Sequence, residues 1–289
     1  MPDRKRKEKP QVSIIGAGRL GTTLAVALES KGYSIGSLVA RRAQRARRAA
    51  ALLERKAEAL GANQIGSLAP SDLFLITVPD DQIAGVAAQL GTLNFDSKPT
   101  AVHTSGALSS EVLSPLRAKG WSTGSVHPLI SVSSPQTSLE GAFWCVEGDR
   151  RAVQVSKTIV RDLGGESFSI RSAEKPLYHA AAVMASGHVV ALFDVALEML
   201  VQCGLTRKTA RRILHPLLAS SVRNLETQDT SQALTGTFSR GDVETVKRHL
   251  AALKGHKLAD ALELYCKLGK RSLKVTRKGT RITRILDGC

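Results

Sequence analysis

The stretch that decides the fold is Val12-Ser-Ile-Ile-Gly-Ala-Gly-Arg-Leu-Gly21. Its first four residues are mostly apolar and predict a short buried strand. Gly16, Gly18 and Gly21 follow with the spacing G-x-G-x-x-G. Leucines then recur at every fourth position, which predicts a helix that ends at Gly32. A second apolar strand is predicted over residues 35–39, so the segment has the order strand, glycine turn, helix, strand.

Each glycine has a separate task in a dinucleotide-binding turn. The first permits the tight turn out of the strand, the second lets the backbone approach a pyrophosphate, and the third lets the helix pack closely on the strand. The phosphates would bind the free N–H groups and the positive dipole end of the helix. We therefore expect dinucleotide binding; the alternative is a chance glycine turn. The contacts expected from this segment are Gly16, Gly18, Arg19, Leu20 and Gly21.

The residues after the second strand bear on the choice between NAD and NADP. An NAD-binding unit usually carries an acidic residue here for the ribose 2′-hydroxyl. This chain has Arg41 and Arg42 instead, and no acidic residue occurs between Glu29 and Glu54. Paired guanidinium groups suit a 2′-phosphate, so we expect NADP as the cofactor. The alternative is an exposed basic start to a helix predicted over residues 43–60.

Further strands are predicted over residues 71–78, 100–103 and 121–126, with shorter ones at 143–146 and 167–170. Their alternation with helices up to residue 171 predicts a doubly wound parallel sheet, the Rossmann arrangement. Ligands of such sheets lie beyond the carboxyl ends of the strands. The residues expected to line the cofactor there are Val78, Pro79, Ser105 and Gly106, and Ser105 is also expected to contact substrate.

From residue 172 onward the pattern is helical throughout. A helix of unusual length is predicted from Glu174 to Cys203, and Thr206 and Asp242 are predicted to cap later helices. The predicted organisation is a lead-in over residues 1–9, an α/β Rossmann domain over 10–171, and an all-α domain over 172–289. The long helix is apolar around most of its circumference, so we expect it to pack against a second copy in a homodimer.

Composition limits where the protein works. The 289 residues are 43% hydrophobic, without an apolar run approaching the ~20 residues that span a bilayer. The charged N-terminus lacks the apolar stretch of a secretory signal. We therefore expect a cytoplasmic protein with no membrane partner. The four cysteines lack C-x-x-C spacing, so we expect thiols rather than disulfides, and no metal site.

The formal net charge is +16, from 41 basic and 25 acidic residues. Such a charge suits nucleic acid, an anionic membrane surface or small anionic ligands. The basic residues are spread along the chain, and aromatic residues are only 4% of it. A stacking platform for nucleic-acid bases is therefore not expected. The alternative to an anionic partner is a set of Arg-rich helix faces exposed to solvent.

The layout resembles the 6-phosphogluconate dehydrogenase-like superfamily, which includes ketopantoate reductases, pyrroline-5-carboxylate reductases and prephenate dehydrogenases. It is closer still to bacterial proteins that join a Rossmann-like domain to domain of unknown function 2520. The resemblance implies an NADP-binding oxidoreductase-like protein of unsettled substrate. The segments that carry it are His103-Thr-Ser-Gly-Ala-Leu108, His127-Pro-Leu129, Tyr178-His-Ala-Ala-Ala182 and Leu234-Thr-Gly-Thr-Phe-Ser-Arg-Gly-Asp-Val-Glu-Thr-Val246.

Lys175 and His179 are the main candidates for chemistry. They stand at i and i+4, and so on one helix face. The matching region of the β-hydroxyacid dehydrogenases and ketopantoate reductases has a lysine that acts as acid or base, and an asparagine four residues later. The resemblance implies the same role for Lys175. This chain has His179 where those families have the asparagine. Histidine suits proton transfer near neutral pH. The alternative is an exposed lysine and a partly buried structural histidine.

His127 and Arg240 are weaker candidates. His127-Pro128 resembles a segment that lines the substrate cleft of prephenate dehydrogenases, and the alternative is a structural histidine at a strand end. Arg240 could bind an anionic substrate or simply lie in a turn. The other five histidines are expected to be structural: His103, His188, His215, His249 and His256.

These observations predict an NADP-dependent oxidoreductase that transfers a hydride between the nicotinamide and a small anionic substrate in a cleft between the domains. One alternative within enzymes is a prephenate dehydrogenase-like activity. An alternative of another class is a non-catalytic NADP-binding sensor, which would share the glycine turn but not require Lys175 and His179 for turnover. A nucleic-acid-associated protein is a third, and its affinity would fall steeply with salt.

Overall fold

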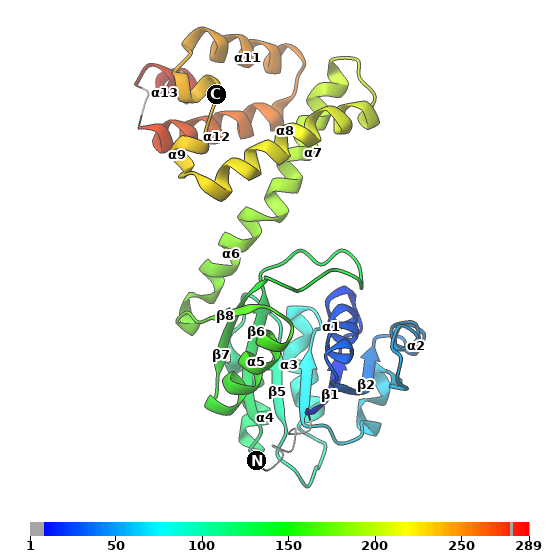
Figure 1. Ribbon diagram of the computed structural model, residues 1–289. Coiled ribbons are helices and arrows are strands. Elements are labelled where there is room, and N and C mark those ends of the chain that lie inside the picture. The colour runs from blue at the N-terminus through cyan, green and yellow to red at the C-terminus, as the bar shows by residue number, and fades with distance from the viewer. Residues whose placement is uncertain (1–8, 278–279, 289) are drawn as a thin grey trace, which may run out of the picture. The chain divides into compact units, whose positions relative to one another are not determined.

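The computed structural model describes residues 9–277 and 280–288. The chain forms two compact units, one up to Ser186 and one from Gly187 onward. The first contains all eight strands and the second is helical (Figure 1). This division falls later than the predicted boundary at residue 172, because helix α6 (Lys175–Ala185) belongs to the first unit. Of the predicted lead-in, residues 1–8 lie outside the described residues.

The eight strands form one sheet in the order β3-β2-β1-β4-β5-β6-β7-β8. All neighbouring pairs are parallel except β6 and β7. The predicted doubly wound parallel sheet is confirmed, with an antiparallel pair at β6 and β7. No helix occurs between residues 129 and 142, and a parallel pair requires a long crossover connection. The strands are β1 (Gln11–Ile15), β2 (Ser34–Ala40), β3 (Glu58–Gly61), β4 (Leu73–Ile76), β5 (Thr100–His103), β6 (Ser122–Pro128), β7 (Phe143–Gly148) and β8 (Glu166–Phe168).

Helices cover both faces of the sheet, each over its own hydrophobic core. One core contains residues of α1 (Arg19–Ser30), α2 (Ala43–Ala50) and α5 (Arg150–Asp162). The other contains residues of α3 (Asp80–Leu90) and α4 (Ser114–Ala118). Successive residues of a strand point to opposite faces, and accordingly Ile14 lies in the first core and Ile15 in the second. The unit is thus a doubly wound Rossmann sheet.

The three glycines of the first turn meet three different environments. Gly16 has φ +117°, and a Cβ there would lie 2.6 Å from the carbonyl carbon of Thr77. A Cβ on Gly21 would overlap the carbonyl oxygen of Gly16 and lie 2.5 Å from Thr77 Oγ1. At Gly18 the nearest atom would be 3.8 Å away, so the space beside it is open. Gly16 and Gly21 therefore allow close backbone packing, whereas Gly18 leaves open space beside the start of the helix.

The helix predicted over residues 43–60 is too long. Helix α2 ends at Ala50, and residues 58–61 form the edge strand β3 beside β2. In the connection between α2 and β3, the backbone N–H groups of Glu54 and Arg55 donate to the carboxylate of Glu29, each at 2.8 Å. The predicted periodicity did not show this contact between distant parts of the chain.

The second unit consists of α7 (Gly187–Gln202), α8 (Arg207–Thr227), α9 (Thr230–Ala233), α10 (Thr237–Arg240), α11 (Val243–Gly255), α12 (Ala259–Thr276) and α13 (Thr280–Asp287). Both predicted N-caps are confirmed: Thr206 accepts from the Thr209 N–H and Asp242 from the Thr245 N–H. The two short helices α9 and α10 were not predicted. A small core joins α11, α12 and α13.

The cysteines differ from the expectation at one position. Cys145 and Cys203 are free thiols. Cys266 takes part in a disulfide bond, so the expectation of thiols alone is wrong there. Cys289 lies outside the described residues.

The long helix predicted over residues 174–203 is interrupted at Ser186, between α6 and α7. The Ser186 hydroxyl donates to the Ala182 carbonyl, a bond that often accompanies a bend. By length and composition alone, Ser172–Gln202 is apolar enough to cross a membrane: an 18-residue window within it has a mean hydropathy of 1.8, and 6% of that window is buried. The expectation that no apolar run reaches this length is therefore wrong.

The glycine contacts predict opposite outcomes for two alanine substitutions. Gly21→Ala should destabilise the protein by about 1–3 kcal/mol, because its Cβ would meet rigid backbone. Gly85→Ala is the matched control: it lies inside α3, where a Cβ would meet nothing within 4 Å. It should stabilise by about 0.5–1 kcal/mol. Urea unfolding of both variants measures this, and a Gly21→Ala variant as stable as the wild type would contradict the packing described above.

Candidate functional site

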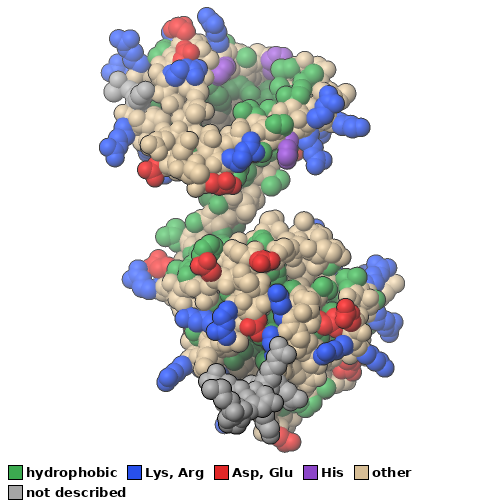
Figure 2. Space-filling model, viewed as in Figure 1, with side chains coloured by type: hydrophobic (Ala, Val, Ile, Leu, Met, Phe, Trp, Pro, Cys, Tyr) green, Lys and Arg blue, Asp and Glu red, His purple; other side chains and the backbone are tan. Residues whose placement is uncertain are grey.

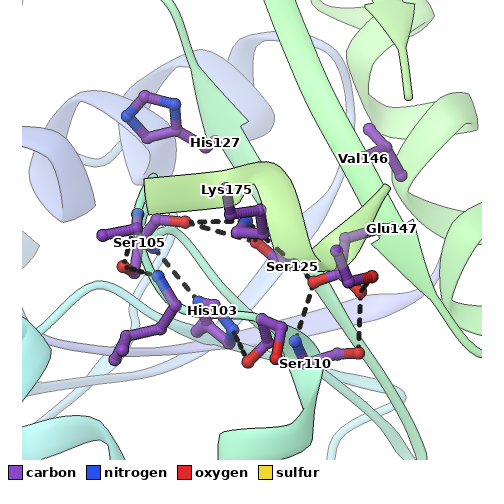
Figure 3. A network of polar contacts seen from close by, with 12 residues as sticks. His103, Ser105, Ser110, Ser125, His127, Val146, Glu147 and Lys175 are labelled. Carbon is purple, nitrogen blue, oxygen red and sulfur yellow. Dashed lines mark hydrogen bonds and ion pairs between the residues drawn. The ribbon is translucent and has the colours of Figure 1, made fainter. Parts of the chain in front are cut away.

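Polar side chains gather in the first unit where the parallel strands β4, β5 and β6 end. Asp80 follows β4, Ser105 follows β5 and His127 is the penultimate residue of β6. The start of α6 brings Lys175 to the same place (Figure 3). The carboxyl ends of parallel strands are where sheets of this kind bind ligands. The topology therefore assembles a candidate site from four separate parts of the chain.

Ser105 lies at the centre of this network. Its hydroxyl donates to Asp80 Oδ2 at 2.7 Å and accepts the backbone N–H groups of Ala107 and Leu108 at 3.2 and 3.0 Å. Its own N–H donates to His103 Nδ1 at 3.2 Å. The Ser105 side chain thus holds the loop that follows β5. To bind the nicotinamide or a substrate, as predicted, it would have to exchange one of these bonds.

His103 has the structural role expected of it. It is completely buried, and its Nε2 lies 3.1 Å from the carbonyl oxygen of Ser109. Burial, together with the nearby Lys175 ammonium, lowers the pKa of His103 to about 4. The neutral ring therefore joins both ends of the Ser105 loop.

Lys175 is buried completely, in contrast to a lysine on an open cleft wall. Its Nζ donates to the Ser105 carbonyl at 3.1 Å and to Ser125 Oγ at 2.7 Å, and lies 4.0 Å from Glu147 Oε1 (Figure 3). Burial lowers the pKa of Lys175, and the negative charge of Glu147 opposes this shift. A general acid must reach its substrate directly or through one water. The predicted proton-donating role of Lys175 stays a prediction, and this burial counts against it.

Glu147 is a part of the site that the sequence analysis missed. Its carboxylate accepts the backbone N–H and the hydroxyl of Ser110, at 2.7 and 2.8 Å, and the hydroxyl of Ser172 at 3.2 Å. The available signal was a single acidic residue inside the apolar strand Phe143–Gly148. A charge in a buried strand requires a partner, and here that partner is Lys175.

His127 and His179 face one another beside Tyr178. The two imidazole ring centroids lie 5.4 Å apart, edge to face. His127 Nδ1 lies 2.7 Å from Tyr178 Oη. Burial raises the pKa of Tyr178, so its neutral phenol can donate to Nδ1 and leave the His127 proton on Nε2. Burial, then His179 and Lys175, lowers the pKa of His127 to about 4, so this ring is neutral at physiological pH. Tyr178 was quoted in the sequence analysis but given no role.

Gly106 leaves the space that these two rings occupy. A Cβ on Gly106 would overlap His179 Nδ1 and lie 2.8 Å from His127 Nε2. Among the residues that the structure describes, His179 Nδ1 is buried without a hydrogen-bond partner. The two ring nitrogens converge on the same point beside the Gly106 backbone. His179 Nδ1 therefore has unused hydrogen-bonding capacity, although like the Lys175 ammonium it is buried.

Several of the residues predicted to hold a cofactor reach the surface, whereas Gly21, Ser105 and Gly106 are buried. Helix α1 begins at Arg19 without a side-chain cap on its N-terminal N–H groups, and Arg19 is exposed. Arg41 and Arg42 are exposed directly after β2. Val78 is partly buried and Pro79 is exposed between β4 and α3. With the open space at Gly18, these features fit a bound dinucleotide phosphate.

Arg240 and four of the remaining histidines belong to the second unit. Arg240 is exposed at the end of α10. Within residues 9–277 and 280–288, no group of three or more His, Cys, Asp or Glu side chains is arranged to hold a metal ion. The basic side chains of both units are dispersed on the face that Figure 2 presents.

Comparisons with known proteins agree with this architecture. Residues 2–128 match the Rossmann-like domain, and residues 142–272 match the domain of unknown function DUF2520. A search of curated proteins finds no match.

Three solved structures illustrate the likeness. A Bacteroides fragilis protein assigned as an NADP oxidoreductase is 22% identical with a TM-score of 0.77, over 94% of this chain and 99% of that one. Protein TM1727 of Thermotoga maritima is 26% identical with a TM-score of 0.71, over 92% and 98%. A reductive aminase from Aspergillus terreus, solved with NADPH and ethyl-5-oxohexanoate, is 16% identical with a TM-score of 0.67, over 96% and 99%. At such identities the likeness to the first and third establishes the fold alone. The chain thus matches the Rossmann-like domain in its first part and domain of unknown function 2520 in its second, and it has structural similarity to NAD(P)-dependent oxidoreductases.

Proposed function

We propose that the protein is an NADP-dependent oxidoreductase that transfers a hydride between the nicotinamide and a small, anionic substrate. The observation that carries the proposal is a shared sheet edge: the glycine turn follows β1, and the His127–His179 pair lies where β5 and β6 end. A dinucleotide bound at the first would extend along the edge that holds the second. The reductive aminase of similar fold was solved with NADPH.

The cofactor proposal depends on charge at the end of β2. Gly16, Gly18, Arg19, Leu20 and Gly21 would hold the pyrophosphate at the start of α1, with Val78, Pro79, Ser105 and Gly106 further along the edge. Arg41 and Arg42 are exposed there, without a carboxylate in the position that selects NAD. Guanidinium groups bind phosphate through paired, charge-assisted hydrogen bonds. This supports NADP rather than NAD.

The substrate proposal depends on the histidine pair. The nicotinamide supplies or accepts the hydride, and the protein must orient the substrate and handle one proton. His127 Nε2 and His179 Nδ1 converge beside Gly106, so they are placed to hydrogen-bond the oxygen or nitrogen of a reacting group. The net charge of +16 suits an anionic substrate. Lys175 holds the Ser105 carbonyl and the Ser125 hydroxyl beside these rings.

One observation favours a second candidate, a non-catalytic NADP-binding sensor. The lysine that the sequence resemblance makes the acid or base is sealed from solvent by its three partners. A sensor needs the cofactor-binding residues and a change of shape, but no proton donor. Turnover separates the two candidates, as described below.

We also propose that a second copy of the chain covers the exposed apolar helices, in a cytoplasmic homodimer. Leu177 and Val190 are 71% and 70% exposed, and Leu217 on α8 is 63% exposed. Figure 2 shows apolar side chains at the surface of the helical unit. A hollow of about 160 Å³ is lined by apolar residues of α7, α10 and α12. Apolar surface of this extent usually marks an interface with a protein or a membrane.

NADPH should bind more tightly than NADH by about tenfold to a hundredfold, because a charge-assisted phosphate contact contributes about 1.5–3 kcal/mol. Isothermal titration with both cofactors measures the ratio. Arg41→Ala with Arg42→Ala should reduce the ratio to near one while leaving NADH affinity within a fewfold. The control is Arg151→Ala on α5, away from the end of β2. Equal affinities of the wild type for NADPH and NADH would contradict the proposed preference for NADP.

Oxidation of NADPH with a panel of 2-oxo acids and cyclic imino acids tests the reaction. For any substrate that is turned over, His127→Ala and His179→Ala should each lower kcat/KM by about 10²–10⁴-fold, the usual contribution of a general acid or base. Gly106→Ala should do the same by displacing both rings. His188→Ala, exposed in the second unit, is the control. Turnover that survives all three site variants would refute the site, and tight NADPH binding without turnover of any compound would favour the sensor.

Light scattering at micromolar concentration should give the mass of two chains, because the apolar helices are too exposed for a stable monomer. Val190→Glu with Leu217→Glu should yield monomers. Ala251→Glu, on an exposed position of α11, is the control. A monomeric wild type that floats with lipid vesicles would instead indicate that the Ser172–Gln202 segment contacts a membrane.

A further inference from the structure

We propose that Glu147 and Lys175 form a positioning pair, in which the buried ammonium anchors the first turn of α6 and thereby sets Tyr178 and His179 against His127. The proposal rests on the proposed function for the meaning of that arrangement. It assigns Lys175 a role that differs from proton donation, and it assigns a role to Glu147 for the first time. Its readout is the histidine arrangement itself, so it can be tested without a substrate.

The ammonium joins residues that lie on, or just after, three different strands. Lys175 Nζ binds the carbonyl of Ser105 after β5 and the hydroxyl of Ser125 on β6, and it faces Glu147 on β7. Ser125 Oγ in turn lies 3.3 Å from the Ser105 carbonyl, to which it donates. Two N–H groups of the ammonium therefore donate to fixed acceptors, and the carboxylate lies at ion-pair distance. An apolar side chain of the same size would fill the space but would not select this orientation.

The carboxylate holds the approach to the same helix. Glu147 Oε2 accepts the hydroxyl of Ser172, in the short 3-10 turn η3 (Ser172–Glu174) that leads into α6. It also accepts both donors of Ser110, in the turn after the Ser105 loop. The chain entering α6 and the loop after β5 are thus attached to one buried group on β7.

Helix geometry passes this anchoring to the histidine pair. Tyr178 and His179 stand three and four residues after Lys175, so all three project from one face of α6. Tyr178 binds His127 Nδ1, and His179 lies over Gly106. Gly106 follows Ser105, whose carbonyl the same ammonium holds. Both sides of the contact between His179 and Gly106 are therefore positioned by Lys175.

The charge also acts on His127 through space. The titratable or charged groups that face this imidazole are His179, Lys175, Asp80, His103 and the Tyr178 phenol. Of these, Lys175 carries a positive charge that opposes protonation of His127, whereas Asp80 favours protonation. Removing the ammonium should raise the pKa of His127. A lysine that only filled space would have no such effect.

The test is an NMR titration of the imidazole Hε1 resonances in the full chain, with and without NADPH. The main variant is Lys175→Met with Glu147→Gln, which removes both buried charges together and so avoids leaving one unpaired. The control is Arg171→Gln with Glu174→Gln, an exposed ion pair at 2.8 Å in the same approach to α6. Ser125→Ala is a milder variant that removes one acceptor of the ammonium without stranding a charge.

The expected result for the double variant is a rise in the pKa of His127 by roughly one unit, the size of effect that a nearby charge has, with altered shifts for His179. Ser125→Ala should move the same resonances less, and the control should leave them unchanged. NADPH affinity should stay within a fewfold. Wild-type titrations of His127 and His179 in the folded double variant or in Ser125→Ala would overturn the proposal. If the wild type does not bind NADPH, the proposed function is refuted, but the effect of the two charges on the His127 titration still stands.

Discussion

The Rossmann unit depends on one backbone contact, between the first turn of α1 and the end of β1. Gly21 lies against the Gly16 carbonyl and Thr77, with no room for a Cβ. That contact brings the N-terminus of α1 to the carboxyl edge of the sheet, beside the turns that follow β4 and β5. The free N–H groups of the helix and the polar loops are therefore found on one edge. A side chain at Gly21 would push the helix start away and separate the two halves of the site.

The site itself follows from the cost of burying charge. An ammonium and a carboxylate without water require partners for every donor and acceptor. Lys175 and Glu147 find them in serine side chains and a backbone carbonyl from separate segments, Ser105, Ser110, Ser125 and Ser172. The polar network is thereby specific in geometry. The two histidines above it are left with ring nitrogens that no described residue uses fully.

The helical unit shows the opposite balance, since its core is small and much of its apolar surface is exposed. Among the described residues of this unit, α11, α12 and α13 share a buried cluster, whereas α7 and α8 present apolar residues outward. Hydrophobic surface removed from water contributes roughly 25 cal/mol per Å². Burial of this surface against another molecule would therefore stabilise the unit, and the same property makes Ser172–Gln202 resemble a membrane span by composition.

Local sequence determined the glycine turn, the caps at Thr206 and Asp242 and most strand positions, because spacing, side-chain size and capping chemistry act between near neighbours. It also placed Lys175 and His179 on one helix face, as α6 has them. Tertiary structure alone decided the rest. The helix predicted to Leu60 ends early, and β3 pairs with β2, in a region where Glu29 binds two distant backbone N–H groups. Burial brought Lys175 to Glu147, and the approach of β6 to α6 paired His127 with Tyr178. These contacts join residues far apart in the chain, and periodicity carries no information about which distant groups will meet.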